Sequence, residues 1–170
     1  MGLKTPNTAD TGAVFSDCDT YRYLLWHEWA PEKSAVAFVG LNPSCARVQD
    51  TNPTFKRCVN YAKYWGFGRI YLVNLFAYRA STPQQLRQAK HPVGTDNDKT
   101  LVEIARQSEL VVAAWGNDGQ YLQRSAQVRA LLPRLHVLKV NRTGEPAHPL
   151  YLKASLKPYA WNFNDVYAKE

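Results

Sequence analysis

Polar side chains that could bind or act on a ligand stand inside, or directly after, short apolar runs of this sequence. Asn42 follows one such run, Asn74 lies inside the next, at 70–75, and His148 follows the last. An amide inside an apolar run is expected to be buried, and a buried amide is costly unless it is hydrogen-bonded. Asn74 therefore bonds to neighbouring backbone, or it pairs with the donor and acceptor edge of a nucleobase.

His148 is the histidine best placed for chemistry. It lies in a predicted loop between Pro146 and Pro149, outside any apolar run. An imidazole can donate a hydrogen bond or a proton near neutral pH, and the alternative is a surface or capping role.

Phe55 opens a predicted helix and is either a core residue or a ring on which a base stacks. The acidic residues near predicted helix starts are expected to be caps, and their spacing does not identify a general base among them. They are Asp50, Asp96, Asp98 and Asp118.

The elements that must position these side chains follow from the apolar pattern. Four runs without polar alternation are typical of strands buried on both faces, as in a parallel sheet. In such folds ligands bind beyond the carboxyl ends of the strands, which is where Asn42, Asn74 and His148 stand. The runs are 35–41, 70–75, 110–115 and 135–140.

Helical segments are predicted between these runs, so the chain alternates strand and helix as α/β proteins do. Two of the helices follow an Asn-Pro or Thr-Pro start signal. Residues 14–29 are rich in aromatics and predict strands at the sheet edge. We expect residues 1–12 to be a loose leader and residues 13–170 to form a single α/β domain. The predicted helices are 54–65, 84–89, 96–107 and 118–132.

The charge balance favours a polyanionic partner. The 170 residues include 21 Lys and Arg against 14 Asp and Glu, a net charge of +7. Nucleic acid is the partner that such a balance suggests first, and simple solubility is the alternative.

The sequence predicts neither a cofactor nor a metal site. The three cysteines form no Cys-x-x-Cys pair, and there is no P-loop or dinucleotide fingerprint. There is no apolar stretch long enough to span a membrane and no secretory signal, so we expect a cytoplasmic protein. We also expect a monomer.

Taken in order, these motifs resemble those of the uracil-DNA glycosylase superfamily. Gly40-Leu41-Asn42-Pro43-Ser44 is similar to its first motif, in the form found in mismatch-specific uracil glycosylases. Leu72-Val73-Asn74-Leu75 resembles the strand whose Asn reads the uracil edge, and His148-Pro149 resembles the start of the last motif. Residues 14–155 also resemble a bacterial and phage family catalogued only as a domain of unknown function.

The glycosylase resemblance implies a three-layer α/β/α sandwich with a mainly parallel, four-stranded central sheet and N-terminal edge strands. It implies hydrolysis of the N-glycosidic bond of a damaged, mismatched or modified base in DNA. Catalysis is then assigned to Asn42, which positions water, and His148, which donates to the departing base. The base-binding residues are Pro43, Ser44, Phe55 and Asn74, and the phosphate-binding residues are Arg47, Lys56, Arg57, Arg79 and Arg142.

Two departures from the superfamily keep other functions open. Asn42 stands where the superfamily usually has a water-activating Asp, and Leu150-Tyr151 replaces the Ser-Pro of the last motif. The first rival is an enzyme that acts on free nucleosides or nucleotides. The second is a module that binds a nucleobase or nucleotide without glycosylase activity.

Overall fold

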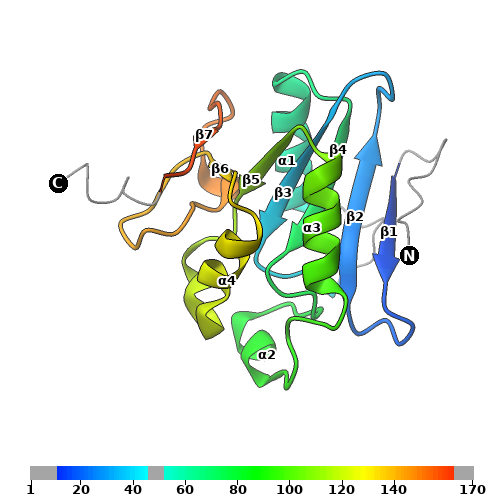
Figure 1. Cartoon of the computed structure of the whole chain (residues 1–170), viewed down its shortest axis with the longest axis vertical. Coiled ribbons are helices and arrows are strands. Elements are labelled where there is room, and N and C mark those ends of the chain that lie inside the picture. The colour runs from blue at the N-terminus through cyan, green and yellow to red at the C-terminus, as the bar shows by residue number, and fades with distance from the viewer. Residues whose placement is uncertain (1–10, 46–51, 163–170) are drawn as a thin grey trace.

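The computed structural model of the protein describes residues 11–45 and 52–162, which form a central sheet with helices on its two faces (Figure 1). The sheet has seven strands in the order β1-β2-β4-β3-β5-β6-β7. These are β1 (Thr11–Phe15), β2 (Arg22–Glu28), β3 (Ala35–Gly40), β4 (Arg69–Asn74), β5 (Leu110–Ala113), β6 (His136–Val137) and β7 (Tyr159–Ala160). Neighbours from β4 to β6 pair in parallel, and the outer pairs are antiparallel. The predicted α/β class is confirmed, and the sheet is mixed.

Alternate residues of each central strand point to opposite faces of the sheet. In β3, Val36 and Phe38 join an apolar cluster with α1 (Pro53–Tyr64). Ala37 and Val39 join a second cluster, which includes buried residues of α3 (Asn97–Gln107) and α4 (Arg124–Leu131). In Figure 1, α1 lies behind the sheet and α3 in front of it. The continuous apolar runs of the sequence are thus explained by burial on both faces.

The two Pro-initiated helices begin as their sequence signals predict. The Asn52 side chain accepts a hydrogen bond from the Thr54 backbone N–H at the start of α1. Thr82 does the same for Gln85 at the start of α2 (Pro83–Gln88). Each cap satisfies a backbone donor that the first turn leaves unpaired.

The single helix predicted over 118–132 is wrong. A 3-10 segment, η1 (Asn117–Gln123), contains a kink near its end and leads directly into α4. Leu122 and Gln123 have positive φ angles of 53° and 56°, which interrupt the helix. Leu122 is also 54% exposed, so its helical spacing from the buried Val128 did not indicate burial.

The ends of the sheet differ in detail from the sequence prediction. β1 begins at Thr11, within the segment predicted as a leader, and pairs with β2 as an antiparallel edge hairpin. At the other end β7, which the sequence did not predict, pairs antiparallel with β6.

Candidate functional site

A cleft of about 610 Å³ opens at the carboxyl ends of β3, β4 and β5, and we call it the strand-end cleft. Its volume is in the range of small-molecule sites, and its place is where ligands bind in open α/β sheets. Four of the predicted site residues line it: Asn42, Ser44, Asn74 and His148. The cleft also includes Asn52 and Thr54 from the start of α1 and residues 114–118 that follow β5.

Asn74 is the last residue of β4 and is only 3% exposed. It pairs in register with Gly40, the last residue of β3, and a Cβ at Gly40 would lie 2.8 Å from the Asn74 Oδ1. The Asn74 Nδ2 is buried and has no hydrogen-bond partner. An unsatisfied buried donor costs about 1–3 kcal/mol, which a ligand acceptor can recover. The sequence predicted that this amide bonds to neighbouring backbone or to a nucleobase. Its Nδ2 makes no bond to neighbouring backbone.

The backbone at Asn74 is held from the opposite face of the sheet. Asn97, fully buried at the start of α3, donates from Nδ2 to the carbonyl oxygens of Asn74 and Leu75, at 3.0 Å each. The Nε of buried Arg124 donates to the same Leu75 oxygen at 2.7 Å. Arg124 is in turn paired with Asp98. The end of β4 is therefore rigidly placed, and Asn74 with it.

Asn42 uses both of its amide hydrogens to fix the loop after β3. Its Nδ2 donates to the backbone oxygens of Pro43 at 2.9 Å and Ala80 at 2.8 Å. The Oδ1 is the part of this amide left to accept a hydrogen bond. An amide oxygen can orient a water molecule, but it cannot remove a proton as a carboxylate does.

His148 is half-buried and caps η2 (Pro149–Tyr151). Its Nδ1 accepts a hydrogen bond from the Leu150 backbone N–H at 3.2 Å. Because Nδ1 is the acceptor, the proton of the neutral ring lies on Nε2, which becomes a donor. Burial lowers the pKa of His148 below its ordinary value. The residue is thus a neutral hydrogen-bond donor at pH 7.

Of the other predicted base-binding residues, one lines the strand-end cleft and two lie outside it. Ser44 lines the strand-end cleft, whereas Pro43 is buried beside it and its backbone oxygen accepts from Ala80 N–H at 3.0 Å. Phe55 packs against the apolar cluster beneath α1 and is not among the cleft-lining residues. Besides His148, the aromatic residues that do line the cleft are Phe38 and Trp115.

The predicted phosphate-binding cations have different environments. Arg57 donates to the Leu152 carbonyl oxygen, and Arg79 donates to the carbonyl oxygens of Asp19 and Cys45, so both tie segments of this chain together. Lys56 and Arg142 are exposed, and Arg47 lies outside the described residues.

Two charged residues of the strand-end cleft were not predicted as site residues: Asp118, which the sequence suggested as a helix cap, and Arg22. Asp118 contributes the one carboxylate among the described residues that line it, and it lies 3.8 Å from the Arg87 guanidinium. Arg22, the first residue of β2, is 4% exposed and lines the same cleft. The signal for Arg22 was a charge inside an aromatic run, which is equally typical of a solvent-facing strand residue.

Cys58, a third missed residue, also lines the cleft but is not a nucleophile. It is 1% exposed, and burial raises the pKa of its thiol above the ordinary value. The thiol is therefore neutral, and the neutral form is the unreactive one.

A family model described as "Protein of unknown function (DUF1643)" matches residues 22–150. The chain belongs to this family. The matched range starts at Arg22 and includes every residue that lines the strand-end cleft. No curated protein and no solved structure matches the chain. The predicted membership of a family without an assigned activity is confirmed, and the likeness to uracil-DNA glycosylases stays a prediction.

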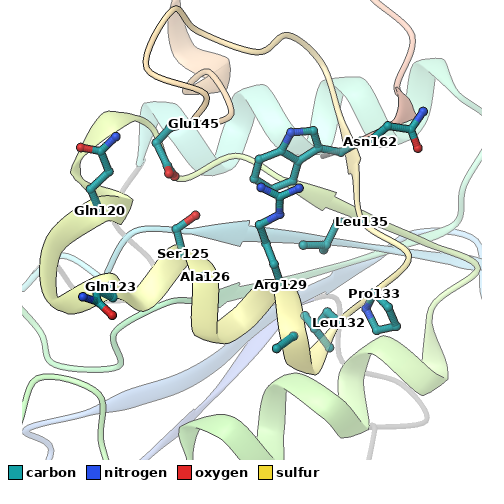
Figure 2. A pocket seen from close by; sticks show the side chains of 12 residues that line it. Gln120, Gln123, Ser125, Ala126, Arg129, Leu132, Pro133, Leu135, Glu145 and Asn162 are labelled. Carbon is teal, nitrogen blue, oxygen red and sulfur yellow. The ribbon is translucent and has the colours of Figure 1, made fainter. Parts of the chain in front are cut away.

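This DUF1643 protein has a second cavity of about 710 Å³ beside α4 (Figure 2). Arg129 projects into it from α4, and the guanidinium carbon lies 3.8 Å from the centroid of the Trp161 ring. Glu145, which also lines it, accepts a hydrogen bond from Trp115 Nε1 at 2.5 Å. No residue predicted from the sequence lines this cavity, so the strand-end cleft is the candidate site.

Neither metal ligands nor a membrane-crossing helix is found in the part of the chain that the structure describes. There, no group of three or more His, Cys, Asp or Glu side chains could hold a metal ion. Its helices are too short or too polar to cross a bilayer.

Proposed function

We propose that this protein holds a nucleobase of DNA in the strand-end cleft and hydrolyses the bond between the base and its sugar. One observation carries the proposal: Asn42, Asn74 and His148, from segments far apart in the sequence, line one cleft, and the Asn74 amide there lacks a partner. A nucleobase edge offers the carbonyl acceptor that such an amide needs.

The arrangement of the elements supports a three-layer α/β/α sandwich of the uracil-DNA glycosylase type. The four strands β4, β3, β5 and β6 pair in parallel in that order. The helix α1 packs on one face and α3 with α4 on the other. The motifs that resemble the glycosylases all stand at the same edge of this sheet.

The chemistry assigns a separate task to each polar group. The bond between the sugar C1′ and the base nitrogen breaks, and its electron pair stays on the base. Negative charge then develops on the base carbonyl, where the Nε2–H of neutral His148 donates a hydrogen bond. A water oriented by Asn42 Oδ1 adds to C1′ and releases a proton to the Asp118 carboxylate or to solvent. Exposed Lys56 and Arg142 are available to DNA phosphates.

One observation favours a second function, a base-binding module without hydrolase activity. The Asn42 amide hydrogens are both bonded to backbone oxygens, so this position holds the loop whether or not water is activated. A silent module predicts binding of the base with no bond cleavage.

Both functions are tested with oligonucleotides that contain uracil, mismatched thymine or another modified pyrimidine. Abasic sites are detected by alkaline strand cleavage, and binding by fluorescence anisotropy. The proposal predicts abasic sites with the wild type, and loss of most of the activity in Asn74→Ala and His148→Ala. The matched control is Asn60→Ala, an exposed amide on α1, which leaves the activity unchanged.

Tight binding without abasic sites for any substrate identifies the silent module. Equal rates for the wild type and both cleft variants contradict the assigned roles. A cleft that takes free nucleotides shows binding with weak salt dependence, because few counterions are released.

A further inference from the structure

Arg22 is a buried cation at the strand-end cleft. It opens β2, is 4% exposed, and lines the cleft together with Asn42 and Asn74. Its backbone N–H donates to the Ala77 carbonyl oxygen at 2.9 Å, which fixes the residue to the segment that follows β4. The backbone of Arg22 is thus held in place beside the cleft.

The Arg22 charge has no carboxylate partner within residues 11–45 and 52–162. Its Nε is buried without any hydrogen bond. Burial, with a smaller contribution from the neighbouring cation Arg79, lowers the pKa of Arg22 to about 10. Arg22 is still charged at pH 7, so this buried positive charge has no countercharge among the described residues. Taking a charge out of water without a partner is strongly unfavourable.

The other buried arginine of the fold shows what compensation looks like. Arg124 is 2% exposed, and it pairs with Asp98 and donates to Leu75 and Gln127 oxygens. These partners explain its burial as a structural one. Within the described ranges, no such set of partners surrounds the Arg22 side chain. The cleft is the side from which a ligand can reach it.

The rest of the cleft wall adds donors suited to an oxyanion. The 12-residue helix α1 starts there, with Asn52 and Thr54 in the lining and no acidic residue in its first turn. The start of a helix carries a partial positive charge that favours anions. The hydroxyl-bearing Ser44 and Ser81 line the same cleft.

We propose that Arg22 binds a phosphate group of the ligand inside the strand-end cleft. The inference rests on the proposed function, because it places the phosphate on the same molecule whose base meets Asn74. The phosphate is either the 5′-phosphate of a free nucleotide or a phosphodiester of a DNA strand whose nucleotide is turned into the cleft. A planar guanidinium is well matched to phosphate oxygens, since it can donate two parallel hydrogen bonds.

The test compares the wild type with Arg22→Met, which keeps the length of the stem and removes the charge. Thermal unfolding is followed alone and with inorganic phosphate, deoxyuridine or deoxyuridine 5′-monophosphate. We expect the monophosphate to bind the wild type about tenfold or more tightly than the nucleoside, and this preference to vanish in Arg22→Met. Arg106→Gln, an exposed arginine of α3, is the matched control and keeps the preference.

The stability of the free protein separates a ligand-binding arginine from a structural one. Because no carboxylate of the described residues pairs with Arg22, we expect Arg22→Met to leave the melting temperature unchanged or to raise it. A large fall in melting temperature, with the phosphate preference kept in the folded fraction, overturns the proposal. Arg22→Lys provides the second variant: it keeps the charge, loses the paired donors, and retains part of the preference.

Two further arms identify the source of the phosphate and keep the two proposals distinct. A single-stranded oligonucleotide with an abasic analogue that competes with the monophosphate points to a DNA phosphodiester, and failure to compete points to a free nucleotide. If the preference for phosphate depends on Arg22 but Asn74→Ala does not change base selectivity, the phosphate site at Arg22 is supported and base recognition by Asn74 is refuted. If base selectivity depends on Asn74 but the wild type shows no preference for phosphate, base recognition is supported and the phosphate site at Arg22 is refuted.

Discussion

Gly40 and Asn74 end neighbouring parallel strands in the same register, and the Asn74 Oδ1 occupies the space that a Cβ on Gly40 would need. The separation would be 2.8 Å, closer than a carbon and an amide oxygen can pack without one of them moving. The glycine of the first motif therefore leaves the space that the Asn74 side chain fills. The side chain that it accommodates belongs to a different motif.

Gly40→Ala is expected to displace the Asn74 side chain. Overpacking of this kind costs about 1–3 kcal/mol of unfolding free energy, and we expect nucleotide binding to fall with it. Urea unfolding and binding titrations measure the two effects. Gly66→Ala is the control, because a Cβ there meets nothing within 4 Å and its cost comes from the backbone, whose φ is +88°. Equal binding by Gly40→Ala and the wild type would show that the position of Asn74 is irrelevant.

Asn42→Asp restores the carboxylate usual in the glycosylases, and it is expected to destabilise this protein. The carboxylate cannot donate to the backbone oxygens of Pro43 and Ala80, and it places a negative charge against both. We expect a loss of about 2–4 kcal/mol in the free energy of unfolding, measured by urea titration. A variant as stable as the wild type and more active would show that Asn42 is a weakened catalytic residue rather than a loop anchor.

Asn97→Ala is expected to loosen the end of β4. It removes the buried Nδ2 that donates to the carbonyl oxygens of Asn74 and Leu75, of which Leu75 keeps the bond from Arg124 Nε, at a cost of about 2–4 kcal/mol. Hydrogen exchange at residues 73–76 reports the local effect. The exposed amide variant Asn60→Ala should stay within about 0.5 kcal/mol of the wild type. Unchanged exchange in Asn97→Ala would refute the anchoring role.

His148 makes stability fall on the acid side of neutrality. Its folded-state pKa lies below the ordinary value of about 6.5, so between these two values the unfolded chain binds more protons than the folded one. Its contribution to stability is complete above about pH 6.5 and is lost as the pH falls toward the folded pKa. Protonation also places a hydrogen on Nδ1, which then cannot accept from Leu150 N–H.

The pH effect is measured by urea unfolding of the wild type and His148→Gln at about pH 7.5 and about pH 5.5. The wild type should lose more stability than the variant on acidification. An imidazole titration by NMR should give a midpoint below about 6.5 for His148. A midpoint above that value would mean that the ring is charged in the folded protein and would contradict its role as a neutral donor.

Much of the fold could be predicted because its signals are local. The starts of α1 and α2 follow from Asn52-Pro53 and Thr82-Pro83, whose side chains make the caps that they predict. The apolar runs became neighbouring strands, and the polar residues at their ends met at one edge because parallel strands end on the same side.

What could not be predicted depends on packing between distant segments. Arg22 is buried because β2 lies between β1 and β4, and the aromatic run around it does not indicate this. Phe55 lies in an amphipathic helix, where the pattern does not say whether a ring near the start faces the cleft or the core. The kink at Leu122 and Gln123 lies at the end of η1, in which a Cβ on Gly119 would lie 2.2 Å from the Trp115 ring.

The most direct test of base recognition is a crystal structure of the protein soaked with uracil and, separately, with other free nucleobases. The account predicts a base in the strand-end cleft, with a ring carbonyl accepting from Asn74 Nδ2 and another within reach of His148 Nε2. A base that binds in the cavity beside α4, or that enters the cleft without touching Asn74, would contradict it.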